Sequence, residues 1–161
     1  MKVQKSFDLE EHHTGVLYVV GTPIGNLDDL SPRVKATLES VDIIAAEDTR
    51  HTRKILSHLN VTAKIVSYHQ HNLVPKGKEL IALLRQKKSI ALVSDAGLPG
   101  VSDPGEELIR EAVAHEIPVV PIPGPNAALT ALVASGIPPQ PFLFLGFLPR
   151  QKRQRTQELQ R

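Results

Sequence analysis

Five short apolar segments rich in β-branched residues recur along the chain and alternate with segments whose apolar residues have helical spacing. The apolar segments are 16–20, 41–46, 65–68, 90–93 and 119–122. The helical segments are 32–40, 49–59, 76–86, 105–114 and 126–134. Strands covered on both faces are apolar almost throughout, and parallel strands need a crossover connection. The alternation therefore predicts a three-layer α/β/α fold around a five-stranded, mainly parallel sheet.

Two predicted helices begin at residues that suit a first turn. Ser31 stands before Pro32, and Asp103 stands before Pro104, so a side-chain oxygen precedes a proline in both places. Such an oxygen accepts a hydrogen bond from a free amide of the first turn, where proline is tolerated. We therefore predict helix caps at Ser31 and Asp103.

The composition is that of a globular protein, with 41% apolar and 22% charged residues among 161. No apolar run reaches the ~20 residues of a membrane span, and residues 1–14 lack the apolar centre of a secretory signal. We expect a cytoplasmic protein without membrane association. Cys is absent, and no carboxylate closely follows His69 and His71, so we predict no metal site.

Positive charge gathers at the C-terminal end, although the formal net charge is only +2. The last twelve positions contain five basic residues, namely Arg150, Lys152, Arg153, Arg155 and Arg161. Clustered cations attract a polyanion and release its counterions, which favours contact with nucleic-acid phosphates. A solvated surface helix explains the same charges, and charge alone does not choose between the two.

Ligands of open α/β sheets bind beyond the carboxyl ends of the strands. Unusual loops follow four of the predicted strands, at 21–26, 47–52, 94–105 and 121–126. Glycine and proline in the 94–105 loop shape a rigid surface of exposed peptide groups. Asp95 at its start suits hydroxyl or cationic groups of a ligand, or else caps the following turn. The Pro123-Gly124-Pro125 turn would present the amides that open the last predicted helix.

The other two loops leave alternatives open. The 21–26 loop resembles a dinucleotide-binding turn, but Pro23 removes an amide donor and no third glycine leads into a helix. A nicotinamide cofactor is therefore disfavoured. In the 47–52 loop, Glu47 and Asp48 beside Arg50 and His51 form either a catalytic group or an ion-pair cluster.

In combination, these motifs resemble the tetrapyrrole methylase superfamily. The residues that carry the resemblance are 17–27, 45–52, 94–105, 121–125 and 146–150. They are most similar to the branch that methylates the 2'-hydroxyl of a cytidine in 16S ribosomal RNA. The resemblance implies S-adenosylmethionine as methyl donor, small-subunit ribosomal RNA as substrate, and a homodimer. Two alternatives stay open: a methylase of tetrapyrroles, and a non-catalytic module that binds RNA or dimerises.

The resemblance also assigns roles to individual residues. The residues expected around the cofactor are Pro23, Ile24, Asp95, Ala96, Gly97, Leu98, Pro125, Asn126 and Ala127. The catalytic candidates are Glu47, Asp48 and His51, with Glu47 as the proton acceptor for the ribose hydroxyl. The residues expected to contact RNA are Arg50, Arg150, Lys152, Arg153 and Arg155. The sequence departs from the usual superfamily residues at Gln70, Leu73, Leu98, Asn126 and Leu145.

The expected domain organisation has three parts. Residues 1–14 form a flexible leader, residues 15–146 a cofactor-binding α/β domain, and residues 147–161 a basic linker that starts a second domain. In the superfamily that second domain forms the opposite wall of the cofactor cleft. We therefore expect this chain to be the N-terminal part of a longer enzyme.

Overall fold

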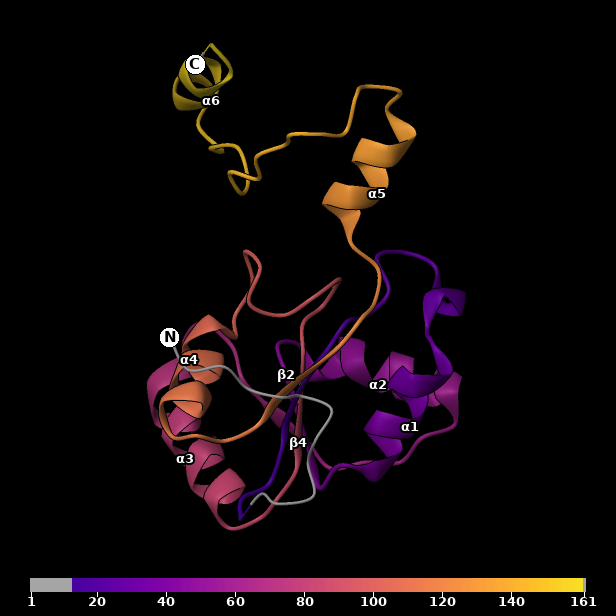
Figure 1. The fold of residues 1–161 in the computed structure, drawn as a ribbon, viewed down its shortest axis with the longest axis vertical. Coiled ribbons are helices and arrows are strands. Elements are labelled where there is room, and N and C mark those ends of the chain that lie inside the picture. Colours follow the sequence, from indigo (N-terminus) through magenta and orange to yellow (C-terminus); the bar gives the residue numbers. More distant parts are fainter. Residues whose placement is uncertain (1–12, 161) are drawn as a thin grey trace. The chain divides into compact units, whose positions relative to one another are not determined.

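The computed structural model describes residues 13–160, so the leader predicted at the N-terminus lies almost entirely outside the described residues. The strands are β1 (Leu17–Val20), β2 (Ile43–Ala46), β3 (Ile65–Ser67), β4 (Ile90–Val93) and β5 (Val119–Ile122). The helices are the 3-10 turn η1 (Leu27–Asp29), α1 (Pro32–Ser40), α2 (Thr49–Leu59), α3 (Leu73–Arg85), α4 (Glu106–Ala114), α5 (Ala127–Ala134) and α6 (Lys152–Leu159). Figure 1 shows this alternation of strands and helices along the chain.

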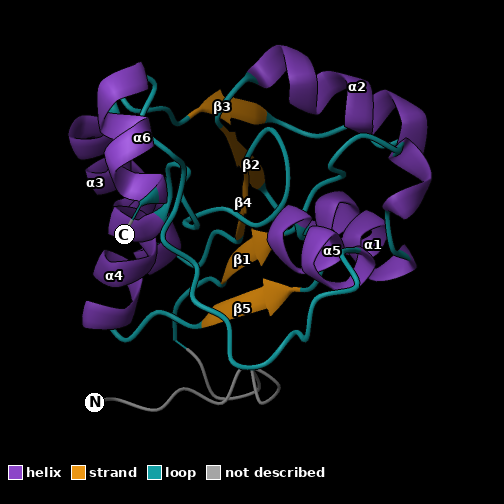
Figure 2. Cartoon of the chain, turned by 90° about the horizontal axis from the view of Figure 1, so that it is seen from above, coloured by secondary structure: helices purple, strands orange, loops and turns teal. Residues whose placement is uncertain are grey.

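The five strands form one sheet in the order β3-β2-β4-β1-β5, and every neighbouring pair is parallel. β1 lies in register with both of its neighbours, since Leu17 stands opposite Ile90 on one side and Val119 on the other. Figure 2 shows the strands side by side in this order. The predicted parallel α/β fold is confirmed, and all five carboxyl ends meet at one edge of the sheet.

Helices cover both faces of the sheet, with α3 and α4 on one face and α1 and α2 on the other (Figure 2). Alternate residues of β4 belong to different cores, because successive side chains of a strand point to opposite faces. Ile90 and Leu92 pack with α3 and α4, whereas Ala91 and Val93 pack with α1 and α2. The sheet is therefore the buried middle layer, which explains its nearly continuous apolar strands.

Most predicted boundaries lie close to the observed ones. The Ser31 hydroxyl accepts a hydrogen bond from the Val34 amide at 3.2 Å, so the cap predicted for α1 is confirmed. Helix α3 begins at Leu73 rather than at residue 76, because Pro75 lies in its first turn, where no intrahelical amide bond is lost. Val41 closes α1 instead of opening β2, since its amide donates to the Thr37 carbonyl.

The predicted cap at Asp103 is wrong. Helix α4 begins at Glu106 after Gly105, and no side chain caps it. Gly105 has φ +143°, and a Cβ there would lie 2.9 Å from Leu92 Cδ2, so the chain enters the helix through a glycine-specific conformation. The Asp103 carboxyl instead hydrogen-bonds with Ser94 at the end of β4.

The chain separates into two compact units, the first ending at Ala127 and the second starting at Ala128. The second unit contains most of α5 and all of α6, and neither helix buries a residue. Its exposed apolar side chains are Leu129, Val133, Ile137, Phe142, Leu143, Phe144, Leu145, Phe147, Leu148 and Leu159. The domain boundaries expected from the sequence stay predictions. Within residues 13–160, no helix has the length and apolarity that crossing a bilayer requires.

Candidate functional site

The loops after β1 and β5 touch through two glycines. The Gly21 amide donates to the Ile122 carbonyl at 3.1 Å, extending the pairing of the two strands. A Cβ built on Gly21 would lie 2.8 Å from Gly124 Cα, and a Cβ on Gly124 would lie 2.8 Å from Gly21 Cα. No side chain fits at either position without movement of the backbone, so these glycines set the spacing between the two loops.

The loop after β4 joins this pair of loops through an isolated antiparallel bridge between Thr22 and Gly97. Their amides and carbonyls exchange hydrogen bonds of 2.9 and 3.1 Å. The Thr22 hydroxyl is buried and donates to the Ser94 carbonyl at 3.1 Å. Gly97 has φ +84°, a conformation that favours glycine, and a Cβ there would be 3.7 Å from the Pro125 carbonyl oxygen. Three strand-end loops therefore form one connected surface.

Most residues expected around the cofactor belong to this surface. Pro23 and Gly97 are buried, Ile24 and Leu98 are half-buried, and Asp95 is exposed at the end of β4. The exposed Ala96 and the half-buried Pro125 lie in the same loops, and Asn126 stands directly before the first residue of α5, Ala127. The structure therefore brings most of the predicted set together, while its role in cofactor binding stays a prediction.

Carboxylates gather where the neighbouring strands β2 and β4 end. The Asp48 amide donates to Asp95 Oδ1 at 3.1 Å, and the Asp95 amide donates to Glu47 Oε2 at 3.4 Å. Asp103 joins them through its hydrogen bond with Ser94. We call Glu47, Asp48, Asp95 and Asp103 the acidic edge. Sequence spacing alone did not reveal that Asp103 belongs to it.

Two carboxyl groups of the acidic edge hold their protons more tightly than usual. Burial raises the pKa of Glu47, and the charges of Asp95, Asp103 and Asp48 raise it further, against an opposing hydrogen bond from the Asp95 amide. Burial also raises the pKa of Asp103, assisted by the charge of Asp95. A carboxylate with a raised pKa is a stronger proton acceptor, which suits the catalytic role expected for Glu47.

Asp48 differs from the other residues of the acidic edge because it forms an ion pair with Arg50. Arg50 Nε and Nη2 lie 3.2 and 2.8 Å from the two carboxylate oxygens of Asp48, and the Arg50 amide adds a bond of 2.8 Å. These bonds hold the pKa of Asp48 far below its usual range. Both alternatives for the 47–52 loop thus have support: Asp48 and Arg50 form an ion pair, whereas Glu47 stands apart from it. His51 is exposed on α2.

We predict that Glu47→Gln stabilises the protein at pH 7 by about 0.5 kcal/mol, a value that allows for solvent screening at this half-buried site. Because the pKa of Glu47 is raised in the folded state, its ionisation costs stability as the pH rises above the ordinary value of 4.5. Urea unfolding at pH 7 and at pH 4 measures the effect. The variant should lose its advantage at pH 4, where native Glu47 is protonated too; an equal gain at both values contradicts the electrostatic cause.

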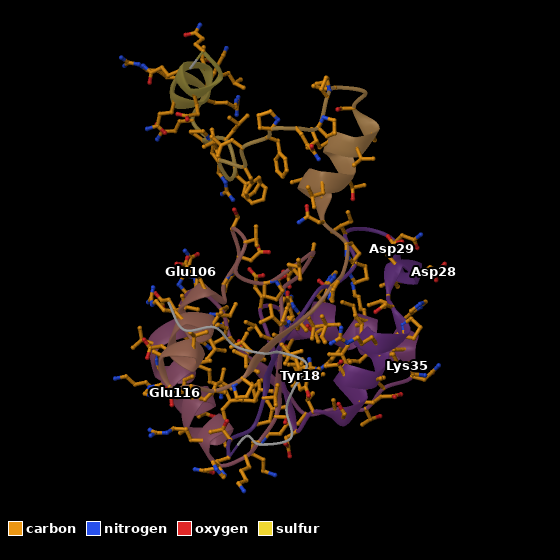
Figure 3. All side chains as sticks on the ribbon, in the orientation of Figure 1. Tyr18, Asp28, Asp29, Lys35, Glu106 and Glu116 are labelled. Atoms are coloured by element: carbon orange, nitrogen blue, oxygen red, sulfur yellow. The ribbon has the colours of Figure 1, made fainter. Side chains whose placement is uncertain are left out.

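The approach to α1 differs from a dinucleotide-binding turn. Asn26 Oδ1 accepts a hydrogen bond from the Asp28 amide and caps η1, so a 3-10 turn separates the 21–26 loop from α1. Figure 3 shows Asp28 and Asp29 on this turn, and Asp28 Oδ1 lies 3.6 Å from His58 Nε2. The amides that open α1 therefore do not adjoin the loop that follows β1, as a nicotinamide site requires.

A cavity of about 670 Å³ lies elsewhere, between α3 and α4. It is lined by Leu73, Ile81 and Leu108 and by charged residues of both helices, and it contains none of the residues predicted from the motifs. Within residues 13–160, no group of three or more His, Cys, Asp or Glu side chains has an arrangement that could hold a metal ion. The candidate site is therefore the carboxyl edge of the sheet.

The residues expected to contact RNA lie in different units. Arg50 is exposed at the start of α2, whereas Arg150, Lys152, Arg153 and Arg155 are exposed in the second unit, three of them on α6. The Arg155 guanidinium donates to the Arg150 carbonyl at 3.4 Å. Their contact with RNA stays a prediction.

Relatives with established names resemble the chain over most of its length. Ribosomal RNA small subunit methyltransferase I of Halalkalibacterium halodurans is 54% identical over 99% of this chain and 55% of its own length. The protein of that name from Bacillus subtilis is 55% identical over 91% of this chain and 50% of its own length. The chain spans about half the length of the curated relatives it matches.

The fold and the sequence also match a wider family. Uroporphyrin-III-C-methyltransferase from Thermus thermophilus has a TM-score of 0.59 and 27% identity, over 77% of this chain and 53% of that one. The family model of the tetrapyrrole (corrin/porphyrin) methylases matches residues 16–161. The resemblance first seen in the strand-end motifs is confirmed, and the chain belongs to the tetrapyrrole methylases.

Proposed function

We propose that this chain is the cofactor-binding part of an S-adenosylmethionine-dependent enzyme that methylates the 2'-hydroxyl of a cytidine in 16S ribosomal RNA, in the cytoplasm. The main support is the identity of 54% over 99% of this chain with a protein named ribosomal RNA small subunit methyltransferase I. The acidic edge provides the second support, because the reaction needs a proton acceptor next to the bound substrates.

The donor set at the sheet edge fits the chemistry of S-adenosylmethionine. Asp95 is an exposed carboxylate, which suits the hydroxyl and ammonium groups of that molecule, and Ile24 and Leu98 offer half-buried apolar surface for its base. Asp95 and the Ala96–Leu98 backbone would hold it, together with Ile24. When bound, it supplies a methyl group on a positively charged sulfur atom.

Glu47 is the group we assign to proton transfer. Its burial and its carboxylate neighbours raise its pKa, so its affinity for a proton from the ribose hydroxyl exceeds that of an exposed glutamate. The Asp95 amide holds Glu47 Oε2 at 3.4 Å and orients the carboxylate. Asp48 is a poorer acceptor because Arg50 lowers its pKa, and His51 remains the other candidate.

The exposed basic residues of the second unit are assigned to the RNA backbone. We predict that replacing Arg150, Lys152, Arg153 and Arg155 by Gln reduces the slope of log K against log salt for binding to small ribosomal subunits by about 3. Filter binding over a range of KCl concentrations measures this slope. Lys78→Gln with Arg85→Gln, two exposed cations of α3, is the control and should leave the slope unchanged. An unchanged slope in the fourfold variant contradicts the assignment.

The exposed apolar residues of the second unit support a homodimer. Phe142, Leu143, Phe147 and Val133 are each more than half exposed, and large apolar side chains exposed to water favour association with another protein surface. Sedimentation equilibrium measures the oligomeric state. A chain that stays monomeric at micromolar concentration contradicts the dimer proposed here.

Two measurements test the proposed function. Calorimetric titration with S-adenosylmethionine should show binding, and transfer of a labelled methyl group should be directed to small ribosomal subunits rather than to a precorrin. Binding of the cofactor together with precorrin methylation would favour a tetrapyrrole methylase. Subunit binding without cofactor binding would favour a non-catalytic RNA-binding module.

A further inference from the structure

One buried hydroxyl joins the loop after β1 to the start of the loop after β4. Thr22 is 1% exposed, and its Oγ1 lies 3.1 Å from the Ser94 carbonyl oxygen and 3.4 Å from the Gly97 carbonyl oxygen. Both carbonyls belong to the turn formed by residues 94–97. A single hydroxyl hydrogen is therefore shared between the first and the last residue of this turn.

The backbone of Thr22 holds the same turn at its far end. The Thr22 amide donates to the Gly97 carbonyl at 2.9 Å, and the Gly97 amide donates to the Thr22 carbonyl at 3.1 Å. These bonds fix Gly97 but do not reach Ser94, whereas the hydroxyl reaches both residues. The side chain of Thr22 thus adds a contact at the start of the turn that the backbone bridge does not make.

The two residues between these contacts are left free for a ligand. Asp95 and Ala96 are both exposed. The Asp95 carboxylate accepts the Asp48 amide through Oδ1, and within residues 13–160 the Ala96 amide donates to no protein group. A carboxylate acceptor and an amide donor therefore stand next to each other on a turn that is held at both ends.

The loop has a composition that makes such a contact important. Gly97, Gly100 and Gly105 all have positive φ, and glycine gives the backbone more conformational freedom than any other residue. A free loop that becomes ordered when a ligand binds loses conformational entropy, which weakens binding. The Thr22 hydroxyl reduces this loss, because it fixes the 94–97 turn before a ligand arrives.

We propose that Thr22 is a positioning residue for the cofactor: its hydroxyl fixes the 94–97 turn so that the Asp95 carboxylate and the Ala96 amide are held ready for S-adenosylmethionine. The inference rests on the proposed function, because it deepens the role of the site assigned there. Thr22 does not touch the cofactor in this assignment. It is buried, and it acts through Asp95 and Ala96.

Three substitutions separate the hydroxyl from the shape of the side chain. Thr22→Val has nearly the same shape but lacks the hydroxyl, and Thr22→Ser keeps the hydroxyl. Thr37→Val is the matched control, because the buried Thr37 hydroxyl also donates to a carbonyl, that of Arg33 at 2.8 Å within α1. Calorimetric titration measures the affinity for S-adenosylmethionine. Hydrogen exchange followed by NMR measures the protection of the Gly97 amide, and urea unfolding measures stability.

We expect Thr22→Val to lower the affinity for S-adenosylmethionine about tenfold, whereas Thr22→Ser and Thr37→Val stay within about threefold of the original chain. The Gly97 amide should exchange about tenfold faster in Thr22→Val and at an unchanged rate in Thr37→Val. If Thr22→Val is less stable in urea but binds the cofactor as tightly as the original chain, Thr22 has a structural role only and the proposal is overturned. Equal losses of affinity in Thr22→Val and Thr22→Ser overturn it too, because the hydroxyl is then not the cause.

A double substitution tests whether Thr22 acts through Asp95. In the Thr22→Val background, Asp95→Ala should lower the affinity by about threefold at most, which is less than in the original chain, because residues that act together have non-additive effects. Additive effects contradict the route through Asp95. If the original chain and Thr22→Val bind S-adenosylmethionine equally, the Thr22 inference fails and the proposed function stands. If the original chain does not bind S-adenosylmethionine, both fail.

Discussion

Replacing Gly21 by alanine is expected to lower the free energy of unfolding by about 3 kcal/mol, the upper part of the range for overpacking a filled interior. The added Cβ would lie 2.8 Å from Gly124 Cα and 2.9 Å from Gly124 N, both of which are backbone atoms. A flexible side chain moves aside at little cost, whereas these atoms belong to a turn between two prolines. Relief therefore requires that β1 and β5 separate at their carboxyl ends. Urea denaturation followed by circular dichroism measures the loss.

Gly77→Ala is the matched control for this substitution. Gly77 lies inside α3, and a Cβ there would be 4.0 Å from Tyr68 Cε2, an ordinary contact distance. Alanine in a helix interior is favoured over glycine by about 0.5–1 kcal/mol, so this variant should be more stable than the original chain. A loss below 1 kcal/mol for Gly21→Ala would mean that the loops after β1 and β5 are not in the close contact described.

The strands and most helices followed from periodicity, because burial of a parallel sheet on both faces leaves a strong local signal. The bounds of β4 are those predicted from its apolar residues, and β1 begins one residue later than predicted. Helix α3 begins three residues earlier than predicted, since Pro75 lies in its first turn, where proline removes no intrahelical hydrogen bond. Local pattern therefore placed the five strands and helices α1 to α5, but it did not predict the short turn η1 or helix α6.

The composition of the site depended on strand order, which no local pattern contains. Gly21 meets Gly124 because β1 pairs with β5, and Asp95 meets Asp48 because β4 pairs with β2. Asp103 was assigned to a cap because Asp-Pro suits a helix start, whereas its carboxyl hydrogen-bonds with Ser94, the residue that directly follows β4. Resemblance to a family supplied the residues of the site, and the sheet order explains why they lie together.

Leu98 shows how a departure from the family is accommodated. Its Cδ2 would lie 3.3 Å from a Cβ at Gly21, so the side chain packs on the loop after β1. It is half-buried, like Ile24 in the neighbouring loop. The loops that follow β1 and β4 thus share an apolar contact in addition to the Thr22–Gly97 bridge. The departure adds apolar surface at the place assigned to the cofactor and removes no glycine that shapes the loop.

The substitution with the largest expected effect on function is at Asp95. Its carboxylate is exposed at the sheet edge, and Oδ1 accepts the Asp48 amide at 3.1 Å, which orients the group. We expect Asp95→Ala to lower the affinity for S-adenosylmethionine by about 10-fold to 100-fold, since hydrogen bonds to a charged group contribute about 1.5–3 kcal/mol. Asp95→Asn retains an oxygen for the Asp48 amide but lacks the charge. Its affinity for S-adenosylmethionine should therefore lie between that of the original chain and that of Asp95→Ala. Calorimetric titration measures all three forms.

Asp42 provides the control for the Asp95 series. Its Oδ2 also accepts an amide hydrogen from a neighbouring segment, that of Ser89 at 2.9 Å, but it precedes β2 and so lies at the opposite edge of the sheet. Asp42→Asn should leave the affinity for S-adenosylmethionine unchanged, because only the carboxyl edge is assigned to the cofactor. If Asp95→Ala binds within twofold of the original chain, Asp95 orients the 47–52 loop without contacting the cofactor. Asp42 and Asp95 have in common only that each carboxylate accepts a hydrogen bond from a backbone amide. If Asp42→Asn weakens binding of S-adenosylmethionine as much as Asp95→Ala does, the lower affinity reflects a less stable fold and not the loss of a contact with the cofactor.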